Sequence, residues 1–405
     1  MRVLIVNTVR EGFSTGKIAY RFCEELYRRG NEALLAYGYE NGDSVMEHTV
    51  RLSNGFEYFI HHVFNAVTGY HSTWAPLPLK RFKKIYEEFK PDIVQLYNLH
   101  GYYMDDYGLF DYLSGKKIPI VYGMLDEYPY LGYCAYAYDC EQFKTGCMDC
   151  KGVRIRGYFG SWFFNRARDT FLMKQKAYEK NNICFTGPQW VLERARSSAL
   201  LKDAVLYEVD EFIDNENTYI PRDKSIVRNE LGIRDDEVMI LNVAPSGDPR
   251  KGVGDYIGYA NEVSNDKLRF VNVGNQEDAN SLPKNYTGIS YVSDQIKLSE
   301  YYSAADIVFC TSHADTMPNV CLEALSCGTP VMGYTLTGVP YVAEAPMGEF
   351  FELNDKTGIV DHLNALGRKS ADMEKRCREY ALARYSLKTY ADKQMEIYER
   401  ILRER

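Results

Sequence analysis

Four of the ten cysteines in the chain are gathered in one short segment, residues 132–152. Their spacing is C-x5-C-x6-C-x2-C, and the closing C-x2-C is a tight turn that lets two thiolates bind one ion tetrahedrally. Two disulfides, a redox pair, an iron–sulfur cluster or unpaired thiols would use the same residues. With two further cysteines upstream of the turn, we expect a structural zinc site. The expected ligands are Cys134, Cys140, Cys147 and Cys150.

The compartment expected for the chain supports zinc over disulfides. The opening residues, "MRVLIVNTVREG", have no long apolar run and no small-residue cleavage site, so they predict a first strand and not a signal peptide. Nowhere do 18 apolar residues follow one another, which predicts no transmembrane helix. We therefore expect a cytoplasmic protein, in a reducing environment that disfavours stable disulfides.

Two adjacent cations stand in the segment "NVAPSGDPRKGVGDYI". Arg250 and Lys251 follow an apolar run, Val238–Pro245, and precede an expected helix. Cations at a helix start oppose the positive end of the helix dipole, and such a local conflict is typical of a functional loop. The segment therefore predicts a diphosphate-binding loop. Two solvated basic residues remain the alternative.

Two carboxylates flank a second expected helix start in "HADTMPNVCLEALSCGTPV". Asp315 precedes the helix, and Glu323 lies eight positions later, inside it. A carboxylate before a helix can accept sugar hydroxyls, and one further in can hold a ribose diol while helix N–H groups face phosphates. The expected donor-binding positions at this helix start are Pro318, Asn319 and Val320.

The first loop, "NTVREGFSTGKIAY", contains Gly16 between an expected strand and an expected helix. Free N–H groups at a helix start can meet an anion, so Gly16 is a further donor-side candidate. A plain tight turn explains the loop equally well. Because the loop does not match G-x-G-x-x-G, a nicotinamide-dependent Rossmann enzyme is disfavoured.

Short apolar runs alternate with helix-length amphipathic stretches along the whole chain. This pattern predicts parallel sheets covered on both faces, an α/β fold. We expect two doubly wound Rossmann-like domains, residues 1–210 and 211–386, and a C-terminal crossover helix at 387–405. In such folds, ligands bind beyond the carboxyl ends of the strands, where the candidate residues lie.

The formal net charge of −8 argues against a nucleic-acid partner, because phosphate neutralisation needs a basic surface. One basic stretch, Leu79–Lys90, is open to two interpretations. It is either a solvated helix face or a patch that holds the protein peripherally at an anionic membrane surface, such as the inner face of the plasma membrane.

Residues 315–323 resemble the E-x7-E motif of glycosyltransferase family 4, with Asp315 in place of the usual first glutamate. "PNVCLEALSCGTPV", "TGVPYVAE" and "RKG" are similar to the second-domain pattern of this family. The resemblance implies the GT-B fold, with two domains facing a cleft, and retaining transfer of a hexosyl group from a nucleotide diphosphate sugar. Arg250 and Lys251 would stabilise the departing diphosphate, so no catalytic divalent metal is expected.

The N-terminal half resembles the exopolysaccharide, or colanic-acid, branch of the family. "STGKIAYRF", "AYGYE", "YHST", "YNLHGYY" and the cysteine segment occur in order. In this branch a histidine precedes the aspartate that matches Asp126, but Leu125 stands at that position here. His100 is a candidate to take over part of its role, and a structural hydrogen-bonding role is the alternative.

The resemblance implies bacterial surface polysaccharide or capsule synthesis, with a glycan or lipid-linked oligosaccharide as acceptor. Gly16, His100 and Asp126 would lie on the acceptor side. Two other functions remain open: a GT-B protein that binds nucleotide sugars without transferring them, and a scaffold that docks a partner through the cysteine segment.

Overall fold

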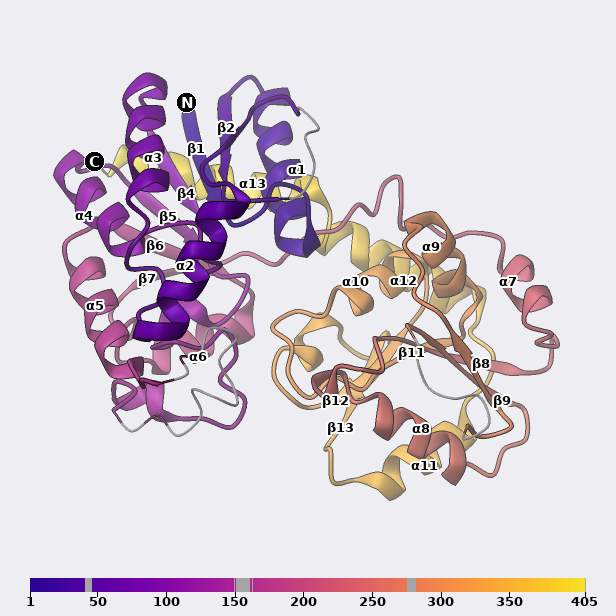
Figure 1. The fold of residues 1–405 in the computed structure, drawn as a ribbon. Helices are drawn as coiled ribbons and strands as arrows, with labels where there is room; N and C mark the ends of the chain where they lie inside the picture. Colours follow the sequence, from indigo (N-terminus) through magenta and orange to yellow (C-terminus); the bar gives the residue numbers. More distant parts are fainter. Residues whose placement is uncertain (41–45, 149, 151–160, 162, 275–281, 405) are drawn as a thin grey trace. The chain divides into compact units, whose positions relative to one another are not determined.

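The computed structural model describes residues 1–404, except 41–45, 149, 151–160, 162 and 275–281. The chain divides into two compact units. The first combines Met1–Glu211 with Tyr390–Arg405, and the second is Phe212–Thr389. Each unit is built on one parallel sheet with helices packed against it (Figure 1).

The first sheet has seven strands in the order β3-β2-β1-β4-β5-β6-β7, and all neighbouring strands run parallel. Its strands are β1 (Arg2–Asn7), β2 (Glu32–Tyr37), β3 (Thr49–Arg51), β4 (Ile93–Leu96), β5 (Ile120–Gly123), β6 (Ile183–Gly187) and β7 (Val205–Glu208). The strand order reverses between β1 and β4, which makes their carboxyl ends the point where a doubly wound sheet offers a ligand crevice.

Among the described residues, seven helices pack around this sheet, and one of them comes from the end of the chain. They are α1 (Phe13–Arg28), α2 (Gly55–Thr68), α3 (Pro76–Phe89), α4 (Asp106–Lys116), α5 (Ala167–Glu179), α6 (Gln189–Ser197) and α13 (Leu387–Arg403). One apolar core contains alternate strand residues such as Leu4, Val94 and Tyr122. Period-two alternation sends the other strand residues to the opposite face of the sheet.

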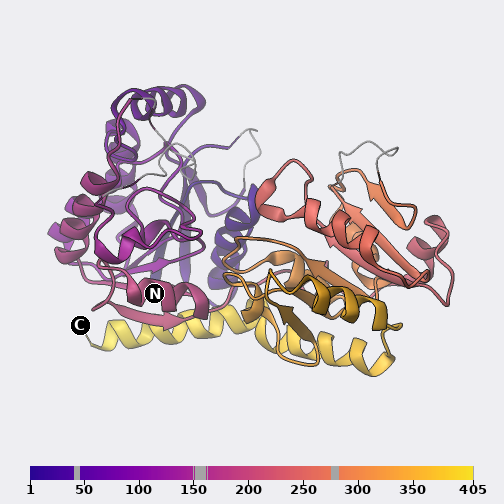
Figure 2. The same ribbon diagram turned by 90° about the horizontal axis from the view of Figure 1, so that it is seen from below.

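Helix α13 runs along the first sheet (Figure 2). It docks on that opposite face through hydroxyl and amide groups. The Tyr390 hydroxyl lies 2.6 Å from that of Tyr97, and Tyr398 donates to Gln95 Oε1 at 2.7 Å. The Tyr390 ring also packs edge-on against Phe22 of α1. The expected C-terminal helix is therefore present. Its polar composition reflects a buried tyrosine and glutamine stripe, in which the Tyr390 and Tyr398 hydroxyls and the side-chain nitrogen of Gln394 have hydrogen-bond partners on the first unit.

The second sheet has six parallel strands in the order β10-β9-β8-β11-β12-β13. Its strands are β8 (Val238–Val243), β9 (Leu268–Val273), β10 (Tyr286–Ile289), β11 (Ile307–Cys310), β12 (Val331–Tyr334) and β13 (Gly348–Phe351). The order reverses between β8 and β11, again beside the candidate site loops. The predicted α/β class with two parallel-sheet domains is confirmed.

Helices cover both faces of the second sheet and create two apolar cores. They are α7 (Lys224–Glu230), α8 (Val253–Glu262), α9 (Gln295–Ala304), α10 (Asn319–Ser326), α11 (Lys356–Ala365) and α12 (Ala371–Arg384). Consecutive strand residues alternate between the cores: Met239 belongs to one and Ile240 to the other. Within the described residues, no helix combines the length and apolar composition needed to cross a membrane.

Candidate functional site

The loops after β8 and β11 meet at the carboxyl edge of the second sheet. Thr311 Oγ1 donates to the Lys251 carbonyl at 3.0 Å, and the His313 amide donates to the Arg250 carbonyl at 2.8 Å. Gly252 has a positive φ of 63°, and a Cβ at this position would lie 2.1 Å from the Thr311 carbonyl oxygen. Only glycine therefore allows the two loops to approach this closely.

Lys251 and Asp315 form an ion pair across these loops, with 2.5 Å between Nζ and Oδ2. Burial alone would lower the pKa of Lys251, but the neighbouring Asp315 carboxylate raises it above its ordinary value. Arg250 donates to the Ala314 carbonyl at 3.1 Å and to Asp248 at 3.1 Å. Both cations are thus held charged beside the strand ends, where an anionic ligand would interact with them strongly.

The backbone around Asp315 is held by a second turn. The Asp315 amide donates to Thr337 Oγ1 at 3.0 Å, and the Gly338 amide donates to the Asp315 carbonyl at 2.8 Å. A Cβ on Gly338 would lie 1.6 Å from the Thr316 carbonyl oxygen, so a side chain there is excluded. These contacts fix the position of the Asp315 carboxylate next to Lys251.

Helix α10 begins directly after this segment, with Pro318 as its N-cap residue. The side-chain oxygen of Asn319 is buried and has no hydrogen-bond partner among the described residues. Glu323, one turn further along, accepts a hydrogen bond from the Tyr302 hydroxyl at 2.7 Å. The donor-side residues from Arg250 to Glu323 therefore belong to one unit, in two neighbouring loops and the helix that follows the second loop, as their sequence positions predict.

The first unit brings together His100 and Asp126, which lie 26 positions apart in the sequence. His100 Nε2 and Asp126 Oδ2 are 2.6 Å apart, and the Tyr128 amide donates to the other oxygen of Asp126 at 2.9 Å. His100 follows β4, and Asp126 follows β5. Leu125 is buried and apolar. The histidine that approaches Asp126 therefore comes from the neighbouring strand.

A buried polar cluster lies behind this pair, and the sequence did not indicate it. Lys174 donates to the carbonyls of Tyr128 and Leu131 at 2.6 and 2.9 Å. Burial lowers the pKa of Lys174 to about 7, and burial raises the pKa of nearby Asp106 well above its ordinary value. Asp106 also accepts from the Tyr128 hydroxyl at 3.1 Å. One signal was available, since Lys174 occupies the buried stripe of α5 with Thr170.

Gly16 lies in the first turn of α1, and a Cβ there would lie 2.9 Å from the Glu11 backbone. In the loop before α1, the carboxylate of Glu40 accepts from the amides of Arg10 and Glu11 at 3.1 and 3.2 Å. Two of the N–H groups that an external anion would need are therefore bonded within the protein. This favours the tight-turn interpretation of the loop.

The cysteine segment is attached to the end of β5 through Glu127. The Glu127 carboxylate accepts from the Ala137 amide at 2.7 Å, and Arg194 lies beside it. All ten cysteines lie within the described residues and have free thiols. Burial, with the neighbouring thiols, raises the pKa of Cys134 to about 12 and that of Cys147 to about 11. Within the described part of the chain, no group of three or more ligands is arranged to hold a metal ion, and zinc stays a prediction.

A separate pocket of about 520 Å³ opens between α8 and the loop before α11. His313 Nε2 lies 2.6 Å from Asp255 Oδ2 at this pocket, and Tyr334 donates to the same oxygen at 3.1 Å. This hydrogen bond to Asp255 raises the pKa of His313. Because His313 and Asp315 are two positions apart in one loop, the pocket adjoins the candidate donor site along the chain.

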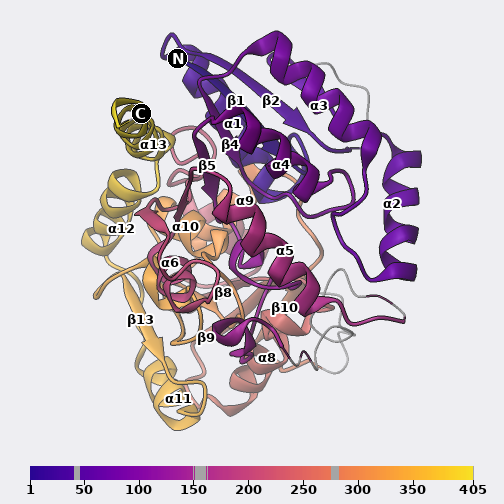
Figure 3. The same cartoon turned by 90° about the vertical axis from the view of Figure 1, so that its left-hand side faces the viewer.

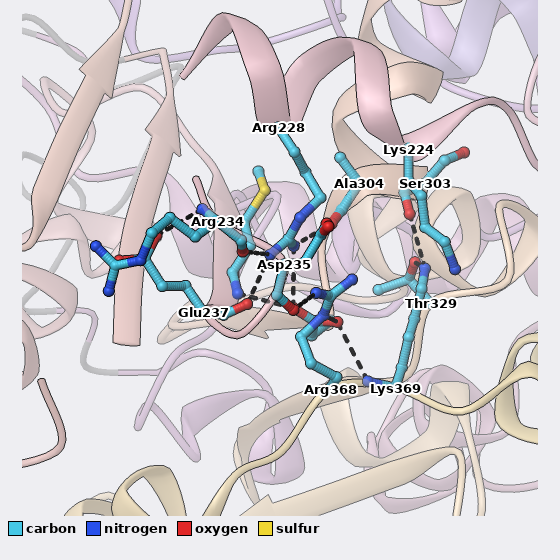
Figure 4. Close-up of polar contacts among 12 residues, drawn as sticks. Lys224, Arg228, Arg234, Asp235, Glu237, Ser303, Ala304, Thr329, Arg368 and Lys369 are labelled. Carbon is cyan, nitrogen blue, oxygen red and sulfur yellow. Dashed lines mark hydrogen bonds and ion pairs between the residues drawn. The ribbon is translucent and has the colours of Figure 1, made fainter. Parts of the chain in front are cut away.

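The opposite, amino edge of the second sheet carries a second charged cluster, which includes Arg228, Arg368 and Lys369 (Figure 4). Asp306 accepts hydrogen bonds from all three residues. Arg228 donates to Asp306 Oδ2 at 3.2 Å and Arg368 to Oδ1 at 2.8 Å, while the backbone amides of Met239 and Lys369 complete its bonds. Lys369 Nζ donates to Ser303 and Thr329, and burial lowers its pKa to about 8. This cluster joins elements on the side away from the strand ends that carry the candidate site.

Comparison with known proteins addresses the second unit most directly. Residues 223–384 match the family described as Glycosyl transferases group 1. The N-acetyl-alpha-D-glucosaminyl L-malate synthase of Bacillus anthracis is 24% identical over 206 residues, which cover 48% of this chain. The chain spans about half, 54%, of the length of that relative.

Solved structures resemble the whole chain. The sucrose-phosphate synthase of Thermosynechococcus elongatus matches with a TM-score of 0.70 and 15% identity, covering 100% of both chains. The HepE protein of Anabaena, solved in complex with UDP, matches with a TM-score of 0.68 and 13% identity, covering 99% of this chain and 100% of HepE. At these identities the likeness shows the fold. Residues 223–384 therefore match the glycosyl transferases group 1 family, and the whole chain shares the two-domain GT-B fold of these solved structures.

Proposed function

We propose that the protein is a retaining glycosyltransferase that moves a hexosyl group from a nucleotide diphosphate sugar to an acceptor hydroxyl. The bond between the anomeric carbon and the diphosphate breaks, and a bond from that carbon to the acceptor oxygen forms. The acceptor hydroxyl loses its proton, and the diphosphate leaves as an anion. The retained configuration and the surface-polysaccharide acceptor rest on the sequence resemblance.

One observation carries the proposal: Lys251 and Arg250 lie where the second sheet reverses its strand order. A departing diphosphate accumulates negative charge, and preorganised cations stabilise that charge without rearranging. Asp315 balances the charge of Lys251, so a bound diphosphate would share this cation with the carboxylate. Asp315 would then also lie beside the donor sugar, in accordance with its predicted role.

The start of α10 would contribute to the same ligand. Helix N-terminal N–H groups favour phosphate oxygens, and Asn319 brings a buried polar side chain to that helix end. Glu323 would hold the ribose, as the sequence suggested, with Tyr302 orienting its carboxylate. This assignment supports UDP-sugars and other nucleotide sugars equally.

On the acceptor side we propose His100 and Asp126 as the reactive pair. A histidine held by a carboxylate is suited to accept or orient a hydroxyl proton, because the carboxylate fixes the ring. The short distance between the two side chains supports a shared role. His100 would thus take the role of the branch histidine, whose position in this chain is occupied by Leu125.

The donor is best identified by thermal shift with a panel of nucleotide diphosphate sugars, because a ligand that binds only the folded state raises its melting temperature. The shifting donor is then incubated with candidate glycan acceptors, and nucleotide release is measured. A donor that binds and is consumed supports transfer. Measurable binding with no consumption for any acceptor would show a protein that binds nucleotide sugars without transferring them, which Leu125 motivates.

We also propose that the four clustered cysteines hold one structural zinc ion, which would stabilise the segment attached to Glu127. Elemental analysis of protein purified without chelator should find about one zinc per chain. Cys147→Ser with Cys150→Ser should lose the metal and make the segment more sensitive to protease. The proposal fails if zinc is absent while the four thiols titrate freely with a thiol reagent.

A further inference from the structure

Helix α2 buries polar side chains and exposes apolar ones. Its buried residues include Glu57, His61 and Asn65, spaced four apart along one side. Its opposite side is apolar and open to solvent. That side consists of Phe56, Phe59, Val63 and Val67, which are 73%, 63%, 44% and 45% exposed. We call these four residues the α2 face.

Specific hydrogen bonds hold the helix in this orientation. Arg81 of α3 donates to both oxygens of Glu57 at 2.7 and 2.8 Å. The His61 ring nitrogen Nδ1 lies 2.9 Å from the Tyr102 carbonyl, and the Tyr133 hydroxyl donates to Asn65 at 2.6 Å. Rotating the helix to bury its apolar side would break all of these bonds and leave buried polar groups without partners. These hydrogen bonds therefore keep the apolar side of α2 facing outward.

Other exposed apolar side chains extend this surface. Trp74 is 48% exposed and its ring centroid lies 5.3 Å from that of Phe64 on α2. At the other end of the helix, the exposed Phe164 lies against Gly69, which caps α2. Figure 3 shows α2 at the edge of the first unit. A group of exposed apolar side chains such as the α2 face and its neighbours is typical of an interaction site.

The surrounding charges identify the partner. Glu57 is the one acidic residue of α2, and it is buried and paired with Arg81. Helix α3, joined to α2 by that ion pair, carries Lys80, Lys83 and Lys84. Its end also carries Glu87 and Glu88, and Glu88 pairs with Lys84, so the basic charges lie mainly on the earlier turns of α3. An apolar helix face with aromatic residues, next to a basic helix, matches the interface of an anionic bilayer, where apolar groups insert and lysines meet lipid headgroups.

We propose that the α2 face inserts into the surface of an anionic lipid bilayer and that the lysines of α3 contact its headgroups. The proposal deepens the proposed function, since an enzyme held at a bilayer is suited to a lipid-linked acceptor. The membrane interaction itself does not depend on transfer. It adds an apolar anchor to the basic stretch, which alone is as consistent with a solvated helix.

Vesicle flotation of the full-length chain tests the anchor. The vesicles contain phosphatidylglycerol and phosphatidylcholine, with pure phosphatidylcholine as the uncharged comparison. The double variant Phe56→Ser, Phe59→Ser should partition about ten-fold more weakly, because two large apolar side chains no longer insert. The control is Tyr291→Ser, which removes an 81% exposed aromatic side chain from the second unit and should partition like the wild type.

The charge arm uses Lys80→Glu with Lys84→Glu, which should weaken binding to the anionic vesicles and leave pure phosphatidylcholine binding unchanged. Lys375→Glu, on the second unit, is its control. Wild-type protein that ignores anionic vesicles at low salt would overturn the proposal. So would a wild-type dimer that Phe56→Ser, Phe59→Ser converts to monomer in sedimentation without a change in flotation, because a second copy would then cover the α2 face.

Donor binding separates this proposal from the proposed function. The α2 variants should keep the thermal shift produced by the nucleotide sugar, because the residues proposed to hold the donor, from Arg250 to Glu323, belong to the second unit. If flotation is confirmed while no nucleotide sugar binds, the membrane surface stands and the transferase proposal fails. If donors are consumed but the protein does not bind vesicles, the transferase proposal stands and the membrane proposal fails.

Discussion

At the amino edge of the second sheet, Asp306 accepts four hydrogen bonds and its side chain is 2% exposed. At the carboxyl edge, Asp315 pairs with Lys251, and the two side chains are 12% and 19% exposed. Both clusters place an aspartate beside two cations. They differ in how many of the hydrogen bonds available to the charged groups are made within the protein.

The Asp306 cluster is closed, because backbone amides and guanidinium groups surround the carboxylate. Breaking it would leave Arg228 buried without its counter-charge, which is costly. The Asp315 cluster is partly open to solvent. The Lys251 ammonium group has three N–H donors, and Asp315 is its hydrogen-bond partner among the described residues. Two similar ion-pair clusters in one domain therefore suit different tasks, the first stability and the second binding.

Asp306→Ala should give the largest effect, a loss of about 3–5 kcal/mol in the free energy of unfolding, because the buried Arg228 loses its partner. Denaturant unfolding followed by circular dichroism measures this loss. Asp236→Ala, which removes an exposed aspartate paired with Arg234 and Lys267, is the matched control and should leave the midpoint unchanged. Equal effects of the two variants would remove the distinction between the closed cluster and a surface ion pair.

Lys251→Ala should lower kcat/KM for the donor about 100-fold or more, because a preorganised cation at the developing diphosphate charge is lost. Its unfolding midpoint should stay close to that of the wild type. Steady-state nucleotide release measures the rate, and Lys375→Ala on an exposed part of α12 is the control. A variant that unfolds readily but keeps normal turnover would place Lys251 in the same structural class as the Asp306 cluster.

His100→Ala extends the comparison to the first sheet, whose strand order also reverses beside the candidate residues. We expect kcat/KM to fall about ten-fold or more, since Asp126 would lose the histidine that it orients. Donor affinity, measured by thermal shift, should be unchanged. His362→Ala on α11 is the control. Unchanged turnover would assign His100 to the structural alternative.

The central strands could be predicted from the sequence, because buried parallel strands are near-continuous apolar runs. Strand β1 lies in the opening residues, where a first strand was expected, and β8 lies within the apolar run Val238–Pro245. The edge strands β3, β7 and β13 are short and carry polar residues, so they have no such run. Edge strands pair on one side only, so their apolar pattern is weak.

The candidate site was predictable to the extent that loop positions determine proximity. Lys251 and Asp315 follow β8 and β11, neighbours in a doubly wound sheet, so their contact follows from topology. The buried Lys174 was missed because a lysine in an amphipathic stretch is normally read as exposed. The orientation of α2 could not be predicted from the sequence pattern either, because the period of apolar residues does not tell which side of a helix faces inward.

The smallest expected effect concerns His313, which adjoins the open cluster and pairs with Asp255. The hydrogen bond to Asp255 raises the folded-state pKa of His313 above its ordinary value of 6.5. A raised histidine pKa stabilises the folded state fully below the unfolded pKa, and this stabilisation is lost as pH rises through the folded value. The difference in unfolding midpoint between wild type and His313→Gln should therefore be present at a pH of about 5.5 and shrink by about pH 8.

The sign of this pH dependence separates His313 from the closed cluster. Burial lowers the pKa of Lys369 to about 8, so the stability change associated with that lysine runs the other way, rising with pH above about 8. Urea midpoints for the wild type and His313→Gln, recorded in parallel with Lys369→Met across the pH range, resolve both slopes. If the contribution of His313 to stability grew with pH, Asp255 would not stabilise the protonated ring. The predicted pH dependence at the carboxyl edge of the second sheet would then be wrong.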